Sequence, residues 1–220
     1  FQDDGTQNNP TDEPGTVILK DATIENVRSS AITTKKRGDN VHCGDYGPNH
    51  YGGLIFAENT IFLNNTRGVE FLPMDNENLS RFINCTFELT EPESVNYFSG
   101  VSMFGVHGVR FDDCTFTIVD GIVDNGQPNA HEYRGITTLN SGFIVENSCE
   151  FNNLYYGVRM QNTQLQGHPT IIGSTNGGNG RNIFSNNKYD IFARVINDLD
   201  IGFNDFLGGD RTNCSAYIFG

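Results

Sequence analysis

A motif that returns along the chain constrains the fold more than any other feature, because every copy of a repeat must form the same structural unit. The segment IFLNNTRGVEF at 61–71 aligns without a gap with IFSNNKYDIFA at 183–193, and FNNLYYGVRM at 151–160 follows the same frame. Each copy places an Asn-Asn turn shortly after a Phe, and a pair made of a small and an aliphatic residue begins six positions after that Phe. The chain therefore repeats one short unit.

The aromatic position of this motif can be followed through the whole chain. A polar turn residue usually lies three positions before it, as Asn59 does before Phe62. The anchor residues found in this way are Ile24, Phe62, Phe87, Phe116, Phe151, Phe184 and Phe206. Their shortest spacings, 22 and 25 residues, match three brief strands and three turns, and apolar residues alternate with polar ones as strands require. We predict an all-β fold, a right-handed parallel β-helix (solenoid) of about seven coils.

The longer spacings predict inserted loops at two corners of the coil. Residues 90–98 and 119–133 enlarge one corner, and residues 34–52 and 161–180 enlarge another. Functional groups of a solenoid tend to lie on such insertions.

Composition indicates one body and limits its partners. No linker divides the chain, so we expect a polar segment at 1–14 and one β-helix at 15–220. The net charge of -13, with only 14 Lys and Arg residues, argues against nucleic acid as a partner. No run of 18 apolar residues marks a membrane span in this segment. Residues 216–220 read as a strand without a polar cap, so we expect the segment to belong to a longer polypeptide.

Three phrases resemble a known class of protein: GLIFAENTIFLNN at 53–65, FINCTF at 82–87 and VENSCEFNN at 145–153. They resemble right-handed parallel β-helix repeat proteins of the pectate-lyase-like superfamily. They are similar, more narrowly, to the large secreted or cell-surface proteins of Bacteroidetes-type bacteria that carry a sorting domain for type IX secretion. The resemblance implies the fold and an extracellular or cell-surface location, with glycans or secretion and surface machinery as partners. The shared residues are stacking and turn residues, so they say little about activity.

Three cysteines, Cys85, Cys114 and Cys149, each lie two residues before an anchor. The spacing of zinc ligands is missing, so we predict an inward ladder of small side chains. Five cysteines in all exclude a fully paired disulfide framework.

Asparagines recur at the expected corners of the coil. They could bind sugar hydroxyls, but Asn more often caps backbone groups and adopts left-handed conformations at tight turns. We favour this structural role for Asn59, Asn84, Asn153 and Asn187.

Carboxylates offer two further candidates. The pair Asp112-Asp113 has the residue type that glycoside hydrolysis needs, yet neighbours on a strand point to opposite faces, and Asp113 stands at the corner position of Asn84. An acidic run near the C-terminus could bind Ca²⁺, although no known loop spacing accompanies it. Its members are Asp198, Asp200, Asp205 and Asp210. We predict no metal site and no cofactor, with Ca²⁺ as the alternative.

The insertions hold the residues that could act on a ligand. Polysaccharide β-elimination needs a base, a proton donor and a cation beside the uronate, and one insertion supplies these types. The catalytic candidates are His131, Tyr133, Arg134 and Asp124. Tyr side chains can stack on sugar rings. The ligand-binding candidates are Asp45, Tyr46, His50 and Tyr51.

We expect a noncatalytic module of an extracellular or cell-surface protein, exported as secreted cargo. It would act as a stiff structural or adhesion element with glycan contact. The alternative is a polysaccharide lyase or glycoside hydrolase acting on acidic glycans. The net charge of -13 weakens this alternative, since an anionic substrate would be repelled unless a local basic patch or Ca²⁺ intervened.

Overall fold

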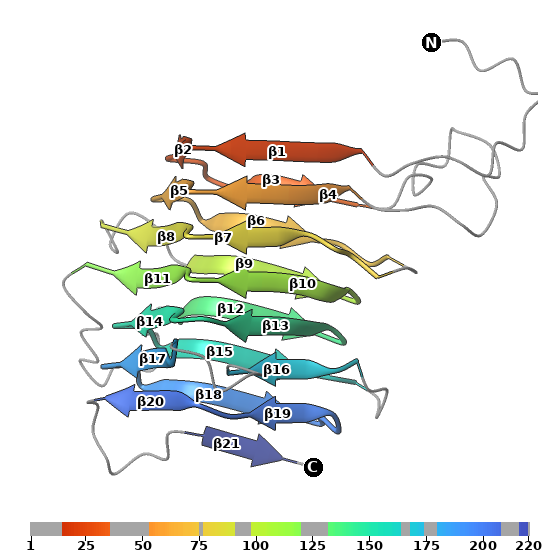
Figure 1. Ribbon diagram of the computed structural model, residues 1–220, viewed down its shortest axis with the longest axis vertical. Helices are drawn as coiled ribbons and strands as arrows, with labels where there is room; N and C mark the ends of the chain where they lie inside the picture. The colour runs from red at the N-terminus through yellow and green to blue at the C-terminus, as the bar shows by residue number, and fades with distance from the viewer. Residues whose placement is uncertain are drawn as a thin grey trace, which may run out of the picture.

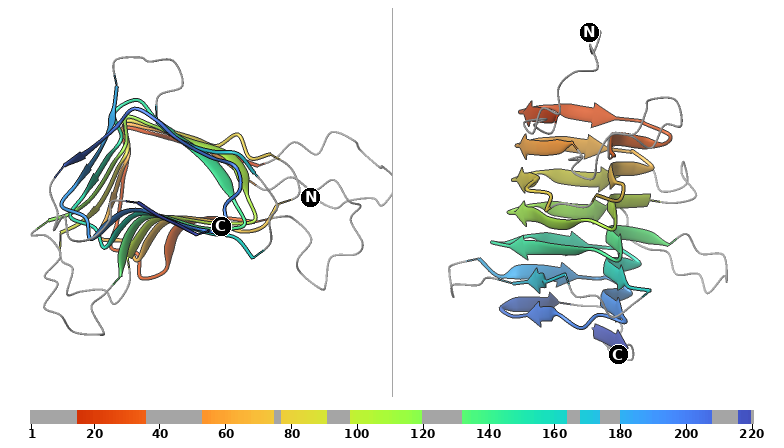
Figure 2. Two further views of the ribbon diagram at one scale, coloured as in Figure 1. Left: turned by 90° about the horizontal axis from the view of Figure 1, so that it is seen from below. Right: turned by 90° about the vertical axis from the view of Figure 1, so that its right-hand side faces the viewer.

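The computed structural model describes residues 15–35, 53–74, 77–90, 98–119, 132–163, 168–173 and 180–207, and the backbone of one further strand at 216–219. Three seven-stranded parallel sheets form the walls of one tube (Figures 1 and 2). The chain visits the three walls in turn and advances by one strand per wall in each coil. The fold is the right-handed parallel β-helix of about seven coils that the repeat predicted. No described helix is long and apolar enough to cross a membrane.

The strands are short, as the repeat spacing requires. Sheet A comprises β1 (Thr16–Lys20), β4 (Leu54–Glu58), β7 (Arg81–Ile83), β10 (His107–Asp112), β13 (Gly142–Glu146), β16 (Thr170–Ile172) and β19 (Leu199–Ile201). Sheet B comprises β2 (Thr23–Glu25), β5 (Ile61–Leu63), β8 (Thr86–Leu89), β11 (Thr115–Ile118), β14 (Glu150–Asn152), β17 (Asn182–Ser185) and β20 (Asn204–Leu207). Sheet C comprises β3 (Ser30–Thr34), β6 (Arg67–Phe71), β9 (Phe98–Phe104), β12 (Tyr133–Leu139), β15 (Tyr156–Gln161), β18 (Tyr189–Arg194) and β21 (Ala216–Phe219).

The predicted anchor residues form one column inside sheet B. All are paired in register from coil to coil, beginning with Ile24 against Phe62 and ending with Phe184 against Phe206. Between Phe62 and Phe184 the rings stack in parallel, with centroids 4.7 to 4.8 Å apart. This distance equals the spacing of neighbouring strands, so each coil repeats the ring position of the last. The ladder supplies much of the apolar core.

A column of glycines in sheet C explains the small residue of the motif. These glycines are Gly68, Gly100, Gly135 and Gly157. A Cβ on any of them would lie 2.6 to 2.8 Å from a carbonyl oxygen of the next coil and 2.7 to 2.9 Å from a ring of the Phe ladder. Only glycine leaves room for both, so the Phe ladder and the glycine column depend on each other.

The corner between sheets A and B is a tight turn with a left-handed residue. Asp21, Asn59, Asn84, Asp113 and Asn147 all have φ between 49° and 55° there. The side-chain amide of Asn84 donates to the side-chain oxygen of Asn59 at 2.8 Å, and the amide of Asn59 donates to Asp21 at 2.9 Å. Asn is favoured at such positions because its short side chain tolerates the left-handed conformation.

Asn residues also cap the corner between sheets B and C. Asn65 and Asn187 are buried, and each accepts a hydrogen bond from a backbone N–H of the preceding coil and donates one to a backbone carbonyl there. Asn153 adopts φ of 60° and donates to the carbonyl of Ile118 at 3.1 Å. The predicted structural role of the corner asparagines is confirmed for these residues.

Asp113 interrupts the asparagine ladder of the first corner, because a carboxylate cannot donate to Asn84. Replacing Asp113 by Asn should let the new amide donate to the Asn84 side-chain oxygen, as Asn84 donates to Asn59. We expect the free energy of unfolding to rise by about 0.5 kcal/mol, measured by urea titration. The neighbouring Asp112→Asn variant is the control, since it weakens an ion pair with Arg81 and should not stabilise the fold. A lower urea midpoint for Asp113→Asn than for the wild type would contradict this account.

The predicted insertions are placed correctly at one corner and only partly at the other. Residues 90–97 and 119–132 join sheet B to sheet C, and residues 35–53 join sheet C to sheet A. The expected single loop at 161–180 is two connections, because β16 lies within it. Residues 162–169 lead from sheet C to sheet A, and residues 173–181 lead from sheet A to sheet B. β16 comprises only Thr170–Ile172, too short for its alternation of apolar and polar residues to stand out in the sequence.

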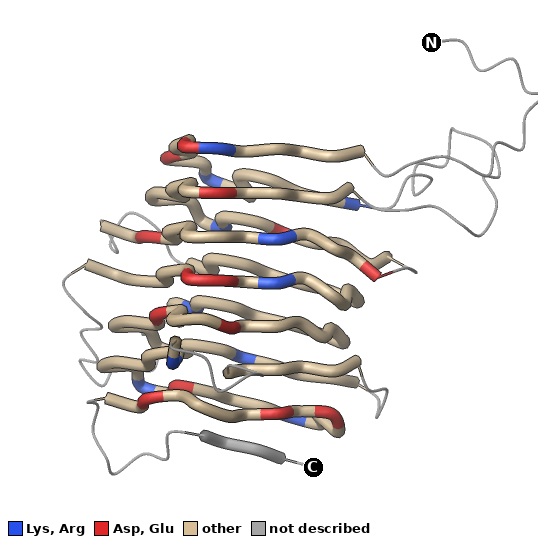
Figure 3. The backbone as a smooth tube through the Cα atoms, in the orientation of Figure 1, with Lys and Arg blue, Asp and Glu red and all other residues tan. Residues whose placement is uncertain are grey.

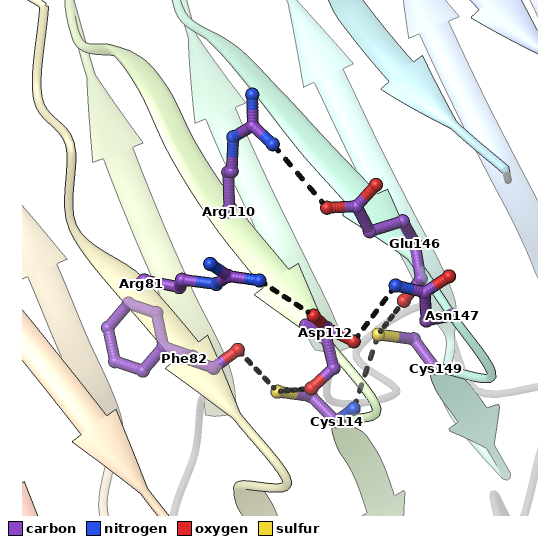
Figure 4. Close-up of polar contacts among 8 residues, drawn as sticks. All are labelled: Arg81, Phe82, Arg110, Asp112, Cys114, Glu146, Asn147 and Cys149. Atoms are coloured by element: carbon purple, nitrogen blue, oxygen red, sulfur yellow. Dashed lines mark hydrogen bonds and ion pairs between the residues drawn. The ribbon is translucent and has the colours of Figure 1, made fainter. Parts of the chain in front are cut away.

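The three cysteines form the predicted inward ladder. Cys85, Cys114 and Cys149 are free and fully buried, and the backbone N–H of Cys114 donates to the sulfur of Cys149 at 3.2 Å (Figure 4). A hydrogen bond with Cys114, together with burial, raises the pKa of the Cys85 thiol far above its usual range. Burial likewise raises the pKa of Cys114. Because the thiolate is the reactive form, these thiols are inert core residues.

Candidate functional site

Sheet C is the wall that long connections border at both ends. The chain enters its strands through residues 90–97 and 119–132, and it leaves them through residues 35–53, 72–80 and 162–169. Most turns from sheet A to sheet B, in contrast, are two or three residues long. The outer face of sheet C is therefore the surface over which inserted residues and wall residues can act together.

The outer face of sheet C carries an aromatic cluster in its later coils. Arg134 of β12, Tyr156 of β15 and Tyr189 of β18 occupy the same position in three successive strands, because each is paired in register with the next. The rings of Tyr156 and Tyr189 stack with centroids 5.1 Å apart, and Phe192 lies edge-on to Tyr156 at 5.6 Å. Tyr155 packs on Tyr156 with centroids 4.9 Å apart. All four rings are partly exposed, so they form a half-open aromatic surface.

Cations lie among these rings. The Arg159 guanidinium is 5.7 Å from the centroid of Tyr156 and 5.9 Å from that of Phe192. The ammonium of Lys188 is 4.7 Å from the ring of Tyr155. These distances are within the range of cation–π attraction, which holds each cation over a ring face. We call Tyr155, Tyr156, Arg159, Lys188, Tyr189 and Phe192 the aromatic–cation cluster.

Arg159 is the member of this cluster whose charge is least compensated. Within the described residues no carboxylate forms an ion pair with it, and its buried Nε has no hydrogen-bond partner. A buried donor without a partner costs free energy that a ligand oxygen could recover. Burial raises the pKa of Tyr156, and the nearby Glu132 carboxylate raises it further, so this phenol stays neutral and can donate a hydrogen bond.

The outer face of sheet A shows a contrasting arrangement. Its cations each form an ion pair with a carboxylate of the next sheet A strand. Figure 3 shows blue and red positions along this front wall. The pairs are Lys20 with Glu58 at 3.4 Å, Arg81 with Asp112 at 3.0 Å and Arg110 with Glu146 at 3.6 Å. Charged groups that satisfy one another in this way offer little to a ligand.

Of the predicted site residues, the structure describes two. Arg134 lies on the outer face of sheet C and forms an ion pair with Glu132. Its neighbour Tyr133 is only 7% exposed and packs in the core. The other six lie outside the described residues, so their proposed roles stay predictions: His131, Asp124, Asp45, Tyr46, His50 and Tyr51.

Two of the carboxylate candidates, Asp112 and Asp205, have structural partners. Asp112 accepts hydrogen bonds from Arg81 at 3.0 Å and from the amide of Asn147 at 3.1 Å, and Figure 4 shows both contacts. Asp205 pairs with Arg181 at 2.6 Å. Asp210 lies outside the described residues, and among those described no three His, Cys, Asp or Glu side chains gather closely enough to hold a metal ion.

The sequence analysis did not predict the aromatic–cation cluster, although the aligned repeats contain a pattern that indicates it. Tyr156 and Arg159 lie in the third copy of the motif, where they served only to establish the frame. Aligning the copies by the Gly position would have put Arg134, Tyr156 and Tyr189 in one column directly before it. Such a column marks an outward row whose members touch across coils.

Comparison of the chain with protein-family models, with curated proteins and with solved structures gave no match. The fold and the geometry of its faces are therefore the basis for a functional assignment.

Proposed function

We propose that this chain is a noncatalytic β-helix module of an extracellular or cell-surface protein, and that it contacts glycans through the outer face of sheet C. The observation that carries the proposal is the aromatic–cation cluster, in which the Arg159 guanidinium lies near the partly exposed rings of Tyr156 and Phe192 and pairs with no carboxylate of the described residues. Sugar rings present apolar C–H faces and hydroxyl oxygens. Tyr rings can stack on the former, and Tyr and Arg can donate hydrogen bonds to the latter.

The architecture supports a stiff adhesion or spacer role for this module. Each coil stacks in register on its neighbours, and the Phe ladder runs unbroken from Phe62 to Phe184. Coils held in this way keep the surface side chains at fixed distances along the axis. A rigid array of contacts suits binding to an extended chain with its own repeat, because little entropy is lost when the surface is already ordered.

Export belongs to the same proposal. The resemblance to β-helix proteins of the pectate-lyase-like superfamily, and to cargo of type IX secretion, supports a secreted or cell-surface location within a longer polypeptide. The test is expression of a tagged gene in its native host, followed by surface protease treatment and fractionation. Recovery of the protein only from the cytoplasm would contradict the proposal.

Replacing Tyr189 by Ala should weaken binding to a recognised glycan, because it removes the partly exposed ring that stacks on Tyr156. We expect a loss of about 1 kcal/mol, or roughly fivefold in Kd, first by screening the wild type on a glycan panel and then by calorimetry. Arg159→Gln should give a loss of similar size, since it removes the donor and its charge.

Phe56→Ala is the matched control for these variants, because Phe56 is a 39% exposed ring of β4, on the outside of sheet A. Its affinity should equal that of the wild type. If all three variants bind equally well, the ligand lies elsewhere, and the aromatic–cation cluster is not the site.

A second candidate is a polysaccharide lyase or glycoside hydrolase acting on acidic glycans. Arg159 favours it, because a cation that pairs with no described carboxylate supplies the local positive charge that an anionic sugar needs on an acidic protein. Incubation with uronate polymers separates the two functions. Release of unsaturated oligosaccharides, abolished by His131→Ala, would establish the lyase, whereas saturable binding without products supports the noncatalytic module.

A further inference from the structure

Two histidines from coils that are not neighbours stack on the outside of the corner between sheets C and A. His107 begins β10, and His168 lies just before β16, two coils away. Their imidazole rings are nevertheless parallel to within 2°, with centroids only 4.3 Å apart. Parallel strands two coils apart are separated by roughly 9.6 Å, so something must bring the rings together.

Two glycines make this approach possible. Gly142 pairs with His107 in the coil between the two histidines, and a Cβ on it would lie 2.7 Å from the Cβ of His168. Gly108 has φ of +94°, and a Cβ there would lie 2.5 Å from Cγ of Glu77. The glycines therefore open the space in which Glu77, His107 and His168 gather along one edge of the tube.

Among the described residues, charged groups around His107 come from a small set of elements. The segment before β7 contributes Glu77, the segment before β16 contributes His168, and β13 begins with Gly142, which has no side chain. The next charged residue of β10 is Arg110, and it is paired with Glu146. The Glu77 carboxylate favours protonation of His107. A positive charge on His168 disfavours protonation of His107.

We propose that His107 and His168 form an acid-sensitive latch, in which two stacked imidazoles hold this corner closed until both carry a proton. When only one of the two imidazoles carries a proton, the rings can remain stacked, and the nearby Glu77 carboxylate stabilises the positive charge. Two imidazolium rings at this distance repel each other, so the second proton separates them. The ring of His168 then leaves Gly142, and the backbone hydrogen bonds of the corner weaken.

The direction of the pH effect follows from the protonation of His107. Burial, and then repulsion by His168, lower the pKa of His107 below its ordinary value of 6.5. When folding lowers the pKa of a His, the His contributes its full stabilisation at pH values above its pKa in the unfolded chain. This stabilisation is lost as the pH falls through the lower, folded pKa.

The test combines histidine titration by NMR with hydrogen exchange of two amides at the corner. The N–H of Asn78 donates to the carbonyl of His107 at 2.7 Å, and the N–H of Gly142 donates to that of Val106 at 3.0 Å. Between about pH 7.5 and pH 5 their protection, corrected for intrinsic exchange, should fall about fivefold more than at the opposite corner. There the N–H of Glu150, bonded to the carbonyl of Cys114 at 2.8 Å, is the reference.

Two variants decide the outcome. His168→Phe keeps an aromatic ring on His107 but cannot be charged, so the acid-dependent loss of protection should disappear and the pKa of His107 should rise. Glu77→Gln should lower the pKa of His107 while leaving the stack in place. The latch is overturned if His168→Phe loses protection at acid pH as the wild type does, or if neither variant moves the pKa of His107.

Discussion

Replacing Phe116 by Ala should lower the free energy of unfolding by about 3 to 5 kcal/mol, the range for removing a fully buried aromatic ring. Phe116 stands in the middle of the ladder, with ring centroids 4.8 Å from both Phe87 and Phe151 and 5.9 Å from Phe111. Removing it leaves a cavity between coils that cannot collapse, because the strand spacing is set by the backbone hydrogen bonds. Urea titration followed by circular dichroism measures the change.

The control for this prediction is Phe206→Ala, the same substitution at the last position of the same ladder. Phe206 is 38% exposed and has a ring on one side only, 5.2 Å from Phe184. Its replacement should cost about 1 kcal/mol, because less apolar area returns to water. Equal losses at the two positions would mean that the ladder does not act as the continuous core described here.

Replacing Gly135 by Ala should destabilise the protein by about 3 kcal/mol, which is unusual for the addition of one methyl group. The new Cβ would lie 2.6 Å from the carbonyl oxygen of Gly157, and 2.8 Å from the ring of Phe151. The first neighbour is backbone and cannot rotate away, so the two coils must separate locally.

Two further variants test the cause of that loss. Gly15→Ala adds the same methyl group where, among the described residues, no non-adjacent atom lies within 4 Å of it, and the urea midpoint should stay unchanged. Combining Gly135→Ala with Phe151→Leu should give a smaller loss than the sum of the two single losses, because the smaller side chain relieves one of the two contacts. Strict additivity would exclude the ring as a partner in the clash.

The repeat was sufficient to predict the fold because each coil is built from local features. The Phe anchors, their alternation with polar residues and the Asn corners all lie within a few residues of one another in the sequence. The stacking of Cys85, Cys114 and Cys149 followed from the same frame, since residues at equivalent positions must meet when coils stack.

The candidate site was harder to predict, because ligand contacts depend on side chains that meet across coils. Tyr156 and Tyr189 are far apart in the chain and stack only because β15 and β18 pair in one register. The candidates that residue type alone suggests lie in or beside the insertions. Most of these candidate residues are outside the described parts of the chain.

Local sequence patterns are enough to specify that the chain forms a parallel β-helix, where its coils begin and which side chains face inward. These properties repeat with the chain and need only local patterning and the rule that strands stack in register. Which outward polar groups find a hydrogen-bond or ion-pair partner depends on the three-dimensional packing of the coils. Arg81 and Arg159 are both outward arginines of a strand, yet one faces a carboxylate of the next coil and the other faces two aromatic rings. Register between coils contributes to that difference, because it brings Asp112 within reach of Arg81 and sets Phe192 opposite Arg159, whereas Tyr156 lies on the same strand as Arg159.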